Sequence, residues 1–280
     1  PDIIHALHAL KGGIPAMEIA EQFAVPFVAT ITGTDLNIDL LQSENPQITK
    51  VFDKAAKLIT YSELSKDRLL SRLPFLSGKV SVIRPSVDIG KPKGKRILPA
   101  GLNFLLPSGI RNVKDPSFAI KPLETLKKEF PAINLTIVGP VLDDMLWKNL
   151  SNAIKGKDWI SYMKVSHDEI PDIYYSADVI LNTSISEGLS NAILEAMSLG
   201  KAVLASDCVG NRSVISDGID GLLYRHGDGE DFVHKAKSLI LDLYLRKRLG
   251  KVAKEKVEKE YSLGAEIDSH LRFYREVLEG

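Results

Sequence analysis

Residues 184–197 have the sequence Ser-Ile-Ser-Glu-Gly-Leu-Ser-Asn-Ala-Ile-Leu-Glu-Ala-Met. The apolar run just before them, at 177–182, predicts a buried strand. Residues 192–199 are helix formers apart from Ser198, and Gly200 is a stop signal. We therefore expect a strand, a short loop and then a helix that begins near Leu189 or Ser190.

This junction has the chemistry of a phosphate-binding site. A helix N-terminus presents unpaired N–H groups and a partial positive charge, and Gly188 lets the backbone come close to a ligand. Glu187 lies in the loop and Glu195 in the helix; eight residues turn a helix by about 800°, so the two carboxylates do not share a face. Carboxylates accept hydrogen bonds from hydroxyls, which fits sugars on either side of a diphosphate. Spacing alone equally allows two solvated surface residues.

Composition limits the class of protein. At ~150 residues per domain, the 280 residues predict two domains or one large one. Lys+Arg 36 against Asp+Glu 36 leaves no net charge, which argues against a nucleic-acid or polybasic membrane role, while a peripheral membrane contact stays open. The one cysteine, Cys208, excludes an internal disulfide and a cysteine-based zinc site, and fits a reducing, cytoplasmic setting. No apolar run reaches the ~18–20 residues of a transmembrane segment.

The rest of the chain alternates strands and helices, which is typical of parallel sheets with crossover helices. In the first block we predict strands at 3–7, 27–31, 58–61 and 80–83, and helices at 14–23, 48–56 and 65–73. In the second block we predict strands at 104–107, 135–138, 159–163, 177–182, 202–205 and 221–224, and helices at 117–130, 145–154, 169–176, 213–215, 230–241, 244–260 and 263–278. The fold class is therefore α/β with two doubly wound blocks.

The domain boundaries follow from a change in composition. Residues 91–96 read Lys-Pro-Lys-Gly-Lys-Arg, which is typical of a solvated linker, although a basic patch for an acidic partner is the alternative. We predict a first domain at 1–88, a linker at 89–100, a second domain at 101–262 and a C-terminal helix at 263–280 that packs back toward the first domain. The chain opens on a strand and without Met, so we expect the first domain to be incomplete.

Polar loops follow the strands of the second block, where open α/β sheets bind ligands. Gly109, Arg111 and Lys114 come directly after the strand at 104–107. Arg offers a planar fork and Lys a point charge, a pair that suits a diphosphate. As an isolated loop, these residues would more simply be exposed cations.

Three stretches together carry a resemblance to a known family. Residues 186–197 resemble the paired-glutamate motif of retaining GT-B glycosyltransferases of the glycosyltransferase-4, or group 1, type. Residues 109–116, Gly-Ile-Arg-Asn-Val-Lys-Asp-Pro, resemble the family's basic diphosphate loop, and residues 32–35, Thr-Gly-Thr-Asp, resemble its N-terminal His-Gly-Thr-Asp turn. The residues of these motifs are most similar to those of the small subgroup of glycosyltransferase 1 domain-containing proteins. The resemblance implies a GT-B-like fold of two Rossmann-type domains that face each other across a cleft.

The resemblance also implies roles in the second domain. Glu187 would hold hydroxyls of the donor sugar, and Glu195 would accept from the nucleotide ribose. The backbone N–H groups of Gly188, Leu189 and Ser190 would bind the donor diphosphate. The cations Arg111 and Lys114, with Gly109 in the same loop, would neutralise the diphosphate as the sugar leaves, and Val165 would line the nucleobase.

In the first domain the resemblance places Gly33, Thr34 and Asp35 on the acceptor side of the site. A structural turn, in which Thr34 or Asp35 caps a following helix, is the alternative. The family often has His where this chain has Thr32, and its glycine-rich N-terminal loop has only a weak counterpart at Gly12-Gly13.

We therefore expect a hexosyltransferase that moves a sugar from a UDP or GDP sugar to an unidentified acceptor with retention of configuration. The resemblance implies neither a metal nor a resident cofactor, since the nucleotide sugar is a substrate. A non-catalytic nucleotide-sugar-binding remnant and a sugar-nucleotide epimerase on a related fold are the alternatives. The oligomeric state stays open.

Overall fold

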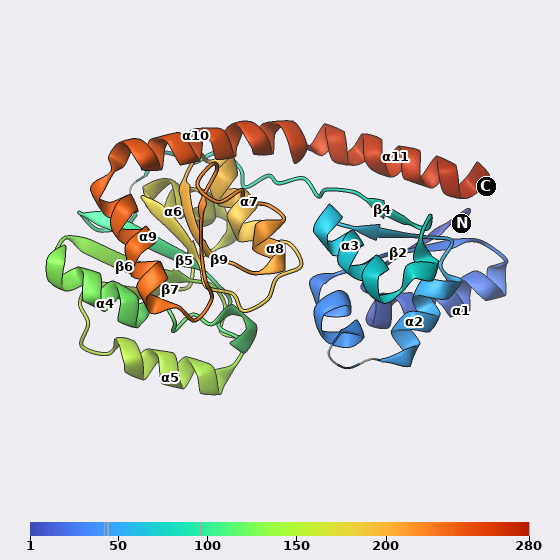
Figure 1. The fold of residues 1–280 in the computed structure, drawn as a ribbon, viewed down its shortest axis with the longest axis horizontal. Helices are drawn as coiled ribbons and strands as arrows, with labels where there is room; N and C mark the ends of the chain where they lie inside the picture. Colours follow the sequence, from blue (N-terminus) through green and yellow to red (C-terminus); the bar gives the residue numbers. More distant parts are fainter. Residues whose placement is uncertain (42, 44, 96, 280) are drawn as a thin grey trace. The chain divides into compact units, whose positions relative to one another are not determined.

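The computed structural model describes residues 1–41, 43, 45–95 and 97–279 and divides the chain into two compact units (Figure 1). The first unit contains residues 1–86 and 260–280, together with the short loop at 187–189. The second unit contains residues 87–186 and 190–259. Two positions in the predicted linker and C-terminal helix, Arg96 and Gly280, lie outside the described residues.

The first unit is built on a parallel four-stranded sheet in the order β1-β2-β3-β4. Its strands are β1 (Ile4–Leu7), β2 (Phe27–Thr30), β3 (Lys57–Thr60) and β4 (Val80–Val82). Its crossover helices are α1 (Ile14–Phe23), α2 (Pro46–Lys54) and α3 (Glu63–Arg72). All seven predicted elements are confirmed, and none of their ends differs from the prediction by more than two residues.

The two faces of this sheet are covered differently. Helices α1 and α2 bury the larger cluster, in which Ile48, Val51 and Phe52 have no exposed surface. A smaller cluster joins Val28 and Ile59 of the sheet to Phe273 of α11 (Leu263–Glu279). The C-terminal helix therefore completes the core of the first unit.

The Gly12-Gly13 pair, the weak counterpart of the family's glycine-rich loop, lies in a π-helical turn at Ala9–Gly13. A Cβ on Gly12 would lie 2.4 Å from the Leu7 carbonyl oxygen, and one on Gly13 would lie 2.6 Å from Val51 Cγ1. Both positions therefore require glycine for close packing, because any side chain would overlap its neighbour.

The second unit contains a parallel six-stranded sheet in the order β10-β9-β8-β5-β6-β7. The strands are β5 (Leu102–Pro107), β6 (Ile133–Val138), β7 (Ile160–Met163), β8 (Val179–Asn182), β9 (Ala202–Ser206) and β10 (Leu222–Tyr224). The chain builds β5, β6 and β7 in one direction and then returns to add β8, β9 and β10 on the other side of β5. The order of the strands therefore reverses between β5 and β8.

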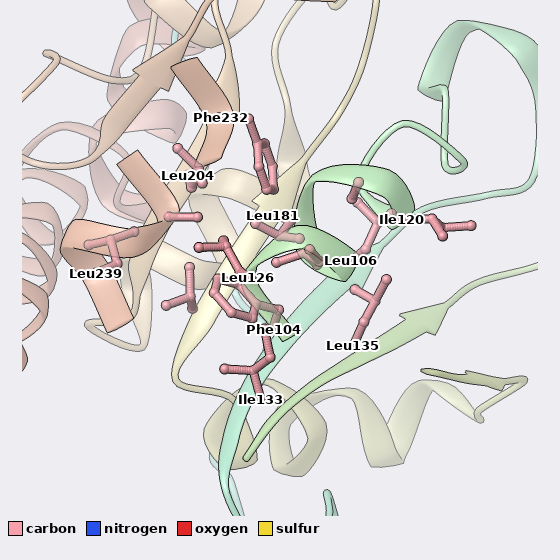
Figure 2. Packing of buried hydrophobic residues seen from close by; sticks show 14 of the residues in the cluster. Phe104, Leu106, Ile120, Leu126, Ile133, Leu135, Leu181, Leu204, Phe232 and Leu239 are labelled. Carbon is pink, nitrogen blue, oxygen red and sulfur yellow. The ribbon is translucent and has the colours of Figure 1, made fainter. Parts of the chain in front are cut away.

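Helices cover both faces of this sheet. They are α4 (Ile120–Glu129), α5 (Asp144–Ile154), α6 (Ile170–Ser176), α7 (Asn191–Ser198), α8 (Val209–Arg212), α9 (Gly229–Leu241) and α10 (Leu243–Glu260). Figure 2 shows one core, where Phe104 and Leu106 of β5 meet Leu126 of α4 and Phe232 of α9. Alternate residues of β5 point to opposite faces, so the buried Leu105 belongs to the other side of the sheet.

Two predicted elements of the second unit are wrong in their limits. The helix expected at 117–130 begins only at Ile120, because Asp115 adopts a left-handed conformation with φ 39° and the chain turns again before the helix. The short helix expected at 213–215 lies earlier, at Val209–Arg212. Asn211 of that helix is buried and donates hydrogen bonds to Asn182 and Ser206. These contacts between distant segments stabilise the helix at this position, and helix propensity alone could not predict them.

The segment predicted as a solvated linker is attached to α6. The described residues of 87–101 form no helix or strand. The backbone N–H of Lys95 donates to Asp172 Oδ1 at 3.3 Å, and that of Ile97 donates to Ser176 Oγ at 2.9 Å. The described segment therefore runs along the second unit. Within the described residues, no helix combines the length and apolar content that a bilayer crossing requires.

The partly buried contact between β1 and α11 predicts a pH-dependent stability. His5 Nδ1 lies 2.6 Å from the Tyr274 hydroxyl and His5 Nε2 lies 2.7 Å from Thr30 Oγ1. Burial, and then the nearby His270, lower the pKa of His5 below its ordinary value of 6.5. As the pH drops below 6.5, His5 becomes protonated in the unfolded chain but stays neutral in the folded chain. The free energy of unfolding therefore decreases as the pH falls from 6.5 toward the pKa of His5 in the folded chain.

We expect the free energy of unfolding of the first unit to decrease between about pH 7 and pH 5, and His5→Gln to reduce that decrease. Urea unfolding across this range measures it. His234 is exposed on α9, so His234→Gln is the matched control and should keep the wild-type slope. Equal slopes for His5→Gln and the wild type would contradict the assignment.

Candidate functional site

The candidate site lies where the strand order of the second sheet reverses. All six strands are parallel, so their carboxyl ends share one edge. Neighbouring strands β5 and β8 carry their following loops, 108–115 and 183–190, to the same part of that edge. In open α/β sheets, a crevice at such a reversal is the usual ligand position.

Hydrogen bonds join these two loops directly. Thr183 Oγ1 donates to the Lys114 carbonyl oxygen at 2.8 Å, and the Ile185 N–H donates to the Val113 carbonyl oxygen at 2.9 Å. Lys114 is half-buried in a short 3₁₀ turn, and Arg111, at the start of that turn, is exposed. The structure therefore brings the predicted cationic loop beside the loop of the paired-glutamate motif.

A third loop, after β6, supports the cationic loop from its other side. The Ile110 N–H donates to the Pro140 carbonyl oxygen at 2.8 Å, and the Leu142 N–H donates to the Ile110 carbonyl oxygen at 3.1 Å. A Cβ on Gly109 would lie 3.0 Å from Leu142 Cδ1. Gly109 therefore allows the two loops to approach each other closely.

Helix α7 begins at Asn191, with Ser190 as its N-cap residue, directly after the predicted start near Leu189 or Ser190. The half-buried residues Glu187, Gly188 and Leu189 form the middle of the loop that leads into it. The Ile193 N–H bonds to the Ser190 carbonyl oxygen at 3.1 Å, which starts the helix. Helix α7 therefore points its N-terminus at the loop of the paired-glutamate motif.

Glu195 has a partner that sequence reasoning missed. The Tyr174 hydroxyl donates to Glu195 Oε2 at 2.8 Å. Tyr174 is buried in α6; burial, followed by the Glu195 carboxylate, raises the pKa of Tyr174 well above its ordinary value. The tyrosine therefore stays neutral and orients the half-buried carboxylate. No motif spacing could have paired these residues, because α6 and α7 are separated by a strand.

Val165 stands apart from the other predicted site residues. It is half-buried and follows β7, the edge strand on the β6 side of the sheet. Its assignment to the nucleobase stays a prediction.

In the first unit, the structure divides the predicted acceptor-side residues. Thr34 is exposed and Gly33 is half-buried, but the Asp35 side chain is fully buried. Asp35 Oδ2 accepts from the Thr32 N–H at 2.8 Å and from Thr32 Oγ1 at 2.9 Å. Asp35 Oδ1 accepts from the Ala9 N–H at 2.8 Å. The carboxylate therefore does not lie open to a ligand, and it does not cap the following turn either; it joins the chain segments after β1 and β2.

His8 lies in the same region, directly after β1. Its Nδ1 lies 2.8 Å from Asp35 Oδ1, and its backbone has φ 74°, which is unusual for a residue other than glycine. A longer contact of 3.5 Å from the Lys11 N–H to the same nitrogen is too weak to compete. A strained histidine beside a buried carboxylate, just after a strand end, is a typical functional arrangement. Its position directly after β1 was the available signal.

One group of described residues has the atoms of a metal site. Ligand atoms of His8, Asp35 and Asp39 lie within 4.8 Å of one another. The Asp35 oxygens, however, already accept hydrogen bonds from the Ala9 and Thr32 N–H groups. A cation would have to replace or share these bonds, so the geometry of the group is that of a structural carboxylate.

These contacts predict a structural effect for Asp35→Asn. A hydrogen bond to a charged group contributes about 1.5–3 kcal/mol. In Asp35→Asn the amide nitrogen would face the N–H donor of Ala9 or Thr32 in place of an acceptor oxygen. We therefore expect the free energy of unfolding of the first unit to decrease by at least about 1.5 kcal/mol. Thermal and urea unfolding measure the loss. Asp39→Asn, at the half-buried neighbour, is the control and should change stability little. Wild-type stability for Asp35→Asn would contradict the assigned bonds.

Two known proteins are similar in sequence to most of this chain. The glycosyltransferase 1 domain-containing protein 1 of Xenopus tropicalis is 28% identical over 261 residues, which cover 88% of this chain and 75% of that protein. The D-inositol 3-phosphate glycosyltransferase of Paenarthrobacter aurescens is 27% identical over 303 residues, which cover 100% of this chain and 74% of that protein.

Solved structures share the fold at low sequence identity. The crystal structure of Anabaena HepE with UDP and glucose has a TM-score of 0.86 at 17% identity, over 98% of this chain and 77% of that chain. The sucrose-phosphate synthase of Thermosynechococcus elongatus has a TM-score of 0.85 at 19% identity, over 99% of this chain and 74% of that chain.

The family profile described as "Glycosyl transferases group 1" matches residues 99–256, which is more than half of the chain. That segment contains β5 to β10 and both loops at the reversal of the strand order. The chain therefore belongs to the group 1 glycosyltransferases and has the GT-B fold.

Proposed function

We propose that this protein transfers a hexose from a UDP or GDP sugar to an acceptor with retention of configuration and without a metal ion. The observation that carries the proposal is the pair of hydrogen bonds that joins the loops after β5 and β8 at the strand reversal. Solved neighbours were crystallised with UDP and with UDP-glucose, which supports the class of donor.

The donor diphosphate is the ligand for the cationic loop and the helix N-terminus. Arg111 supplies a forked donor and Lys114 a point charge, and both gain importance as negative charge builds up on the leaving phosphate. The backbone N–H groups of Gly188, Leu189 and Ser190 contribute a second set of donors on the side of α7. Cations and helix N-terminus thus take the place of a divalent metal.

The two glutamates separate the sugar from the nucleoside. Glu187, in the loop, accepts from hydroxyls of the transferred sugar. Glu195, one turn into α7, accepts from the ribose and is oriented by the Tyr174 hydroxyl at 2.8 Å. Val165 lines the nucleobase through its backbone.

In the reaction, the acceptor oxygen forms a bond to the anomeric carbon as the bond from that carbon to the phosphate oxygen breaks. The acceptor proton passes to that phosphate oxygen, on the same face of the sugar, so the configuration is retained. Gly33 and Thr34 of the first unit contribute to acceptor binding. Asp35 contributes to this part of the site only indirectly, because its Oδ1 lies 2.8 Å from His8 Nδ1 and orients the imidazole.

The alternatives from the sequence make different predictions about ligands. A non-catalytic remnant would bind a nucleotide sugar without turning it over, and an epimerase would convert one sugar nucleotide into another without releasing the nucleoside diphosphate. A thermal-shift screen of UDP, GDP and ADP sugars, followed by assay of released nucleoside diphosphate, separates all three. A ligand that binds only the native state raises its stability by mass action. No stabilisation by any sugar nucleotide would reject the proposal.

The cationic loop generates a prediction about nucleotide affinity. We expect Arg111→Ala to weaken UDP binding at least tenfold, because a charge-assisted hydrogen bond contributes about 1.5–3 kcal/mol. Isothermal titration calorimetry measures the change. Arg248 is a matched control, since it is exposed on α10 and its guanidinium donates to the Gly218 carbonyl oxygen at 3.1 Å, in the segment that precedes β10. Unchanged affinity for Arg111→Ala would reject this loop as the diphosphate site.

The two glutamates generate a prediction about which part of the donor each one binds. We expect Glu195→Ala to weaken free UDP and UDP sugar alike, since both contain ribose. We expect Glu187→Ala to leave free UDP nearly unaffected but to impair turnover. Calorimetry with both ligands and a turnover assay compare the two variants. An equal loss of free UDP binding in both would show that the division of roles is wrong.

A further inference from the structure

A buried polar side chain ties together the two ends of the loop of the paired-glutamate motif. Asn182 is the last residue of β8 and is 5% exposed. Its Oδ1 accepts from the Ser184 N–H at 3.0 Å, at the start of the loop. Its Nδ2 donates to Ser190 Oγ at 3.0 Å, at the end of the loop. A buried amide is costly unless it is hydrogen-bonded, and this one is bonded on both sides.

A second buried asparagine holds the first in place. Asn211, on α8, has no exposed surface, and its Nδ2 donates to Asn182 Oδ1 at 3.0 Å and to the Ser206 carbonyl oxygen at 2.9 Å. Ser206 Oγ in turn donates to the Ser184 carbonyl oxygen at 2.6 Å. The hydrogen bonds close a ring through β8, β9 and α8. The orientation of the Asn182 amide is therefore fixed, with its Nδ2 toward Ser190.

The consequence appears at the N-terminus of α7. Ser190 occupies the N-cap position, where a serine hydroxyl usually accepts a hydrogen bond from an N–H of the first turn. In this chain the Ser190 side chain makes no such bond to α7. Ser62, at the start of α3, behaves in the usual way: its Oγ accepts from the Ser65 N–H at 3.2 Å. The difference is that Ser190 Oγ is turned toward Asn182.

We propose that Asn182 is a positioning residue for donor binding, because it holds the Ser190 hydroxyl away from the first turn of α7. The Ala192 N–H, which a serine cap would bond, is then kept for the anionic oxygens of the donor diphosphate, beside the N–H groups of Gly188, Leu189 and Ser190. The Ile193 N–H already bonds to the Ser190 carbonyl oxygen. Asn211 supports this role by fixing the Asn182 amide. The inference rests on the proposed function, since it assigns a diphosphate to this helix N-terminus.

Substitution of Asn182 tests the inference. In Asn182→Ala the Ser190 hydroxyl can turn to the helix and cap it, and it then competes with the ligand. We expect the dissociation constant of UDP, or of GDP if that nucleotide binds, to rise about fivefold, which corresponds to one cap hydrogen bond. Asn182→Ser, whose hydroxyl is too short to reach Ser190, serves the same purpose if the alanine variant does not fold. Calorimetry and thermal unfolding are measured on each variant.

The decisive comparison is a double variant. Asn182→Ala with Ser190→Ala has no hydroxyl to cap α7, so it should bind the nucleotide more tightly than Asn182→Ala alone. A purely structural role for Asn182 would make the double variant no tighter than the single one, and this result would overturn the inference. Asn103 is a matched control, buried at the opposite end of β5, and Asn103→Ala should lower stability without changing affinity.

The outcomes also separate this inference from the proposed function. If the wild type binds neither UDP nor GDP, the proposed function fails and the role of Asn182 fails with it. If the wild type binds and Arg111→Ala weakens binding, but the double variant shows no recovery, only the role of Asn182 is overturned.

Discussion

Parallel strand pairing is the constraint on which the rest of this structure depends. A parallel pair has to be connected by a crossover, so the chain alternates strands and helices and places every strand's carboxyl end on the same edge of its sheet. In the second sheet the strand order then reverses between β5 and β8. Two loops that are about 70 residues apart in sequence meet there and form direct backbone and side-chain hydrogen bonds. The 108–115 and 183–190 loops, which are distant in sequence, become neighbours as a result.

The loop of the paired-glutamate motif is supported by polar groups and not by apolar packing. Asn182, Ser184, Ser206 and Asn211 are almost fully buried beneath it. The arrangement has a cost, because the buried Asn211 Oδ1 accepts no hydrogen bond from any described residue, and an unsatisfied buried acceptor costs about 1–3 kcal/mol. Apolar residues would fill the same space more cheaply, but they would not specify one loop conformation. A network of directional hydrogen bonds does specify one conformation, since each bond fixes the orientation of its two groups.

A similar principle operates in the first unit, where a buried carboxylate organises two strand ends. Asp35 accepts from backbone N–H groups after β1 and after β2, and it holds His8 at 2.8 Å. The strain recorded in the His8 backbone is tolerated because these contacts determine the conformation from several directions. Both units thus use buried hydrogen bonds to fix the loops at the carboxyl edge of a sheet, while their hydrophobic cores lie between sheet and helices.

The sequence by itself determined the α/β class, the position of most strands and helices, and the strand–loop–helix junction at residues 182–191. These features depend on local properties, namely the apolar period, helix propensity and stop signals. The match of α1 to the predicted range 14–23 and the start of α7 after Ser190 are examples. The family also followed from sequence, because residues 109–116 and 186–197 are contiguous motifs.

Only the tertiary structure decided which residues of different elements meet. Tyr174 reaches Glu195, Asn182 reaches Ser190 and Asn211, and His8 reaches Asp35 through contacts that no spacing rule contains. It also decided that Asp35 is buried and that α8 forms at Val209–Arg212. The physical reason is the same in each case. A hydrogen bond between side chains depends on the packing of whole elements, and that packing is set by burial across the sheet and not by the residues adjacent in the chain.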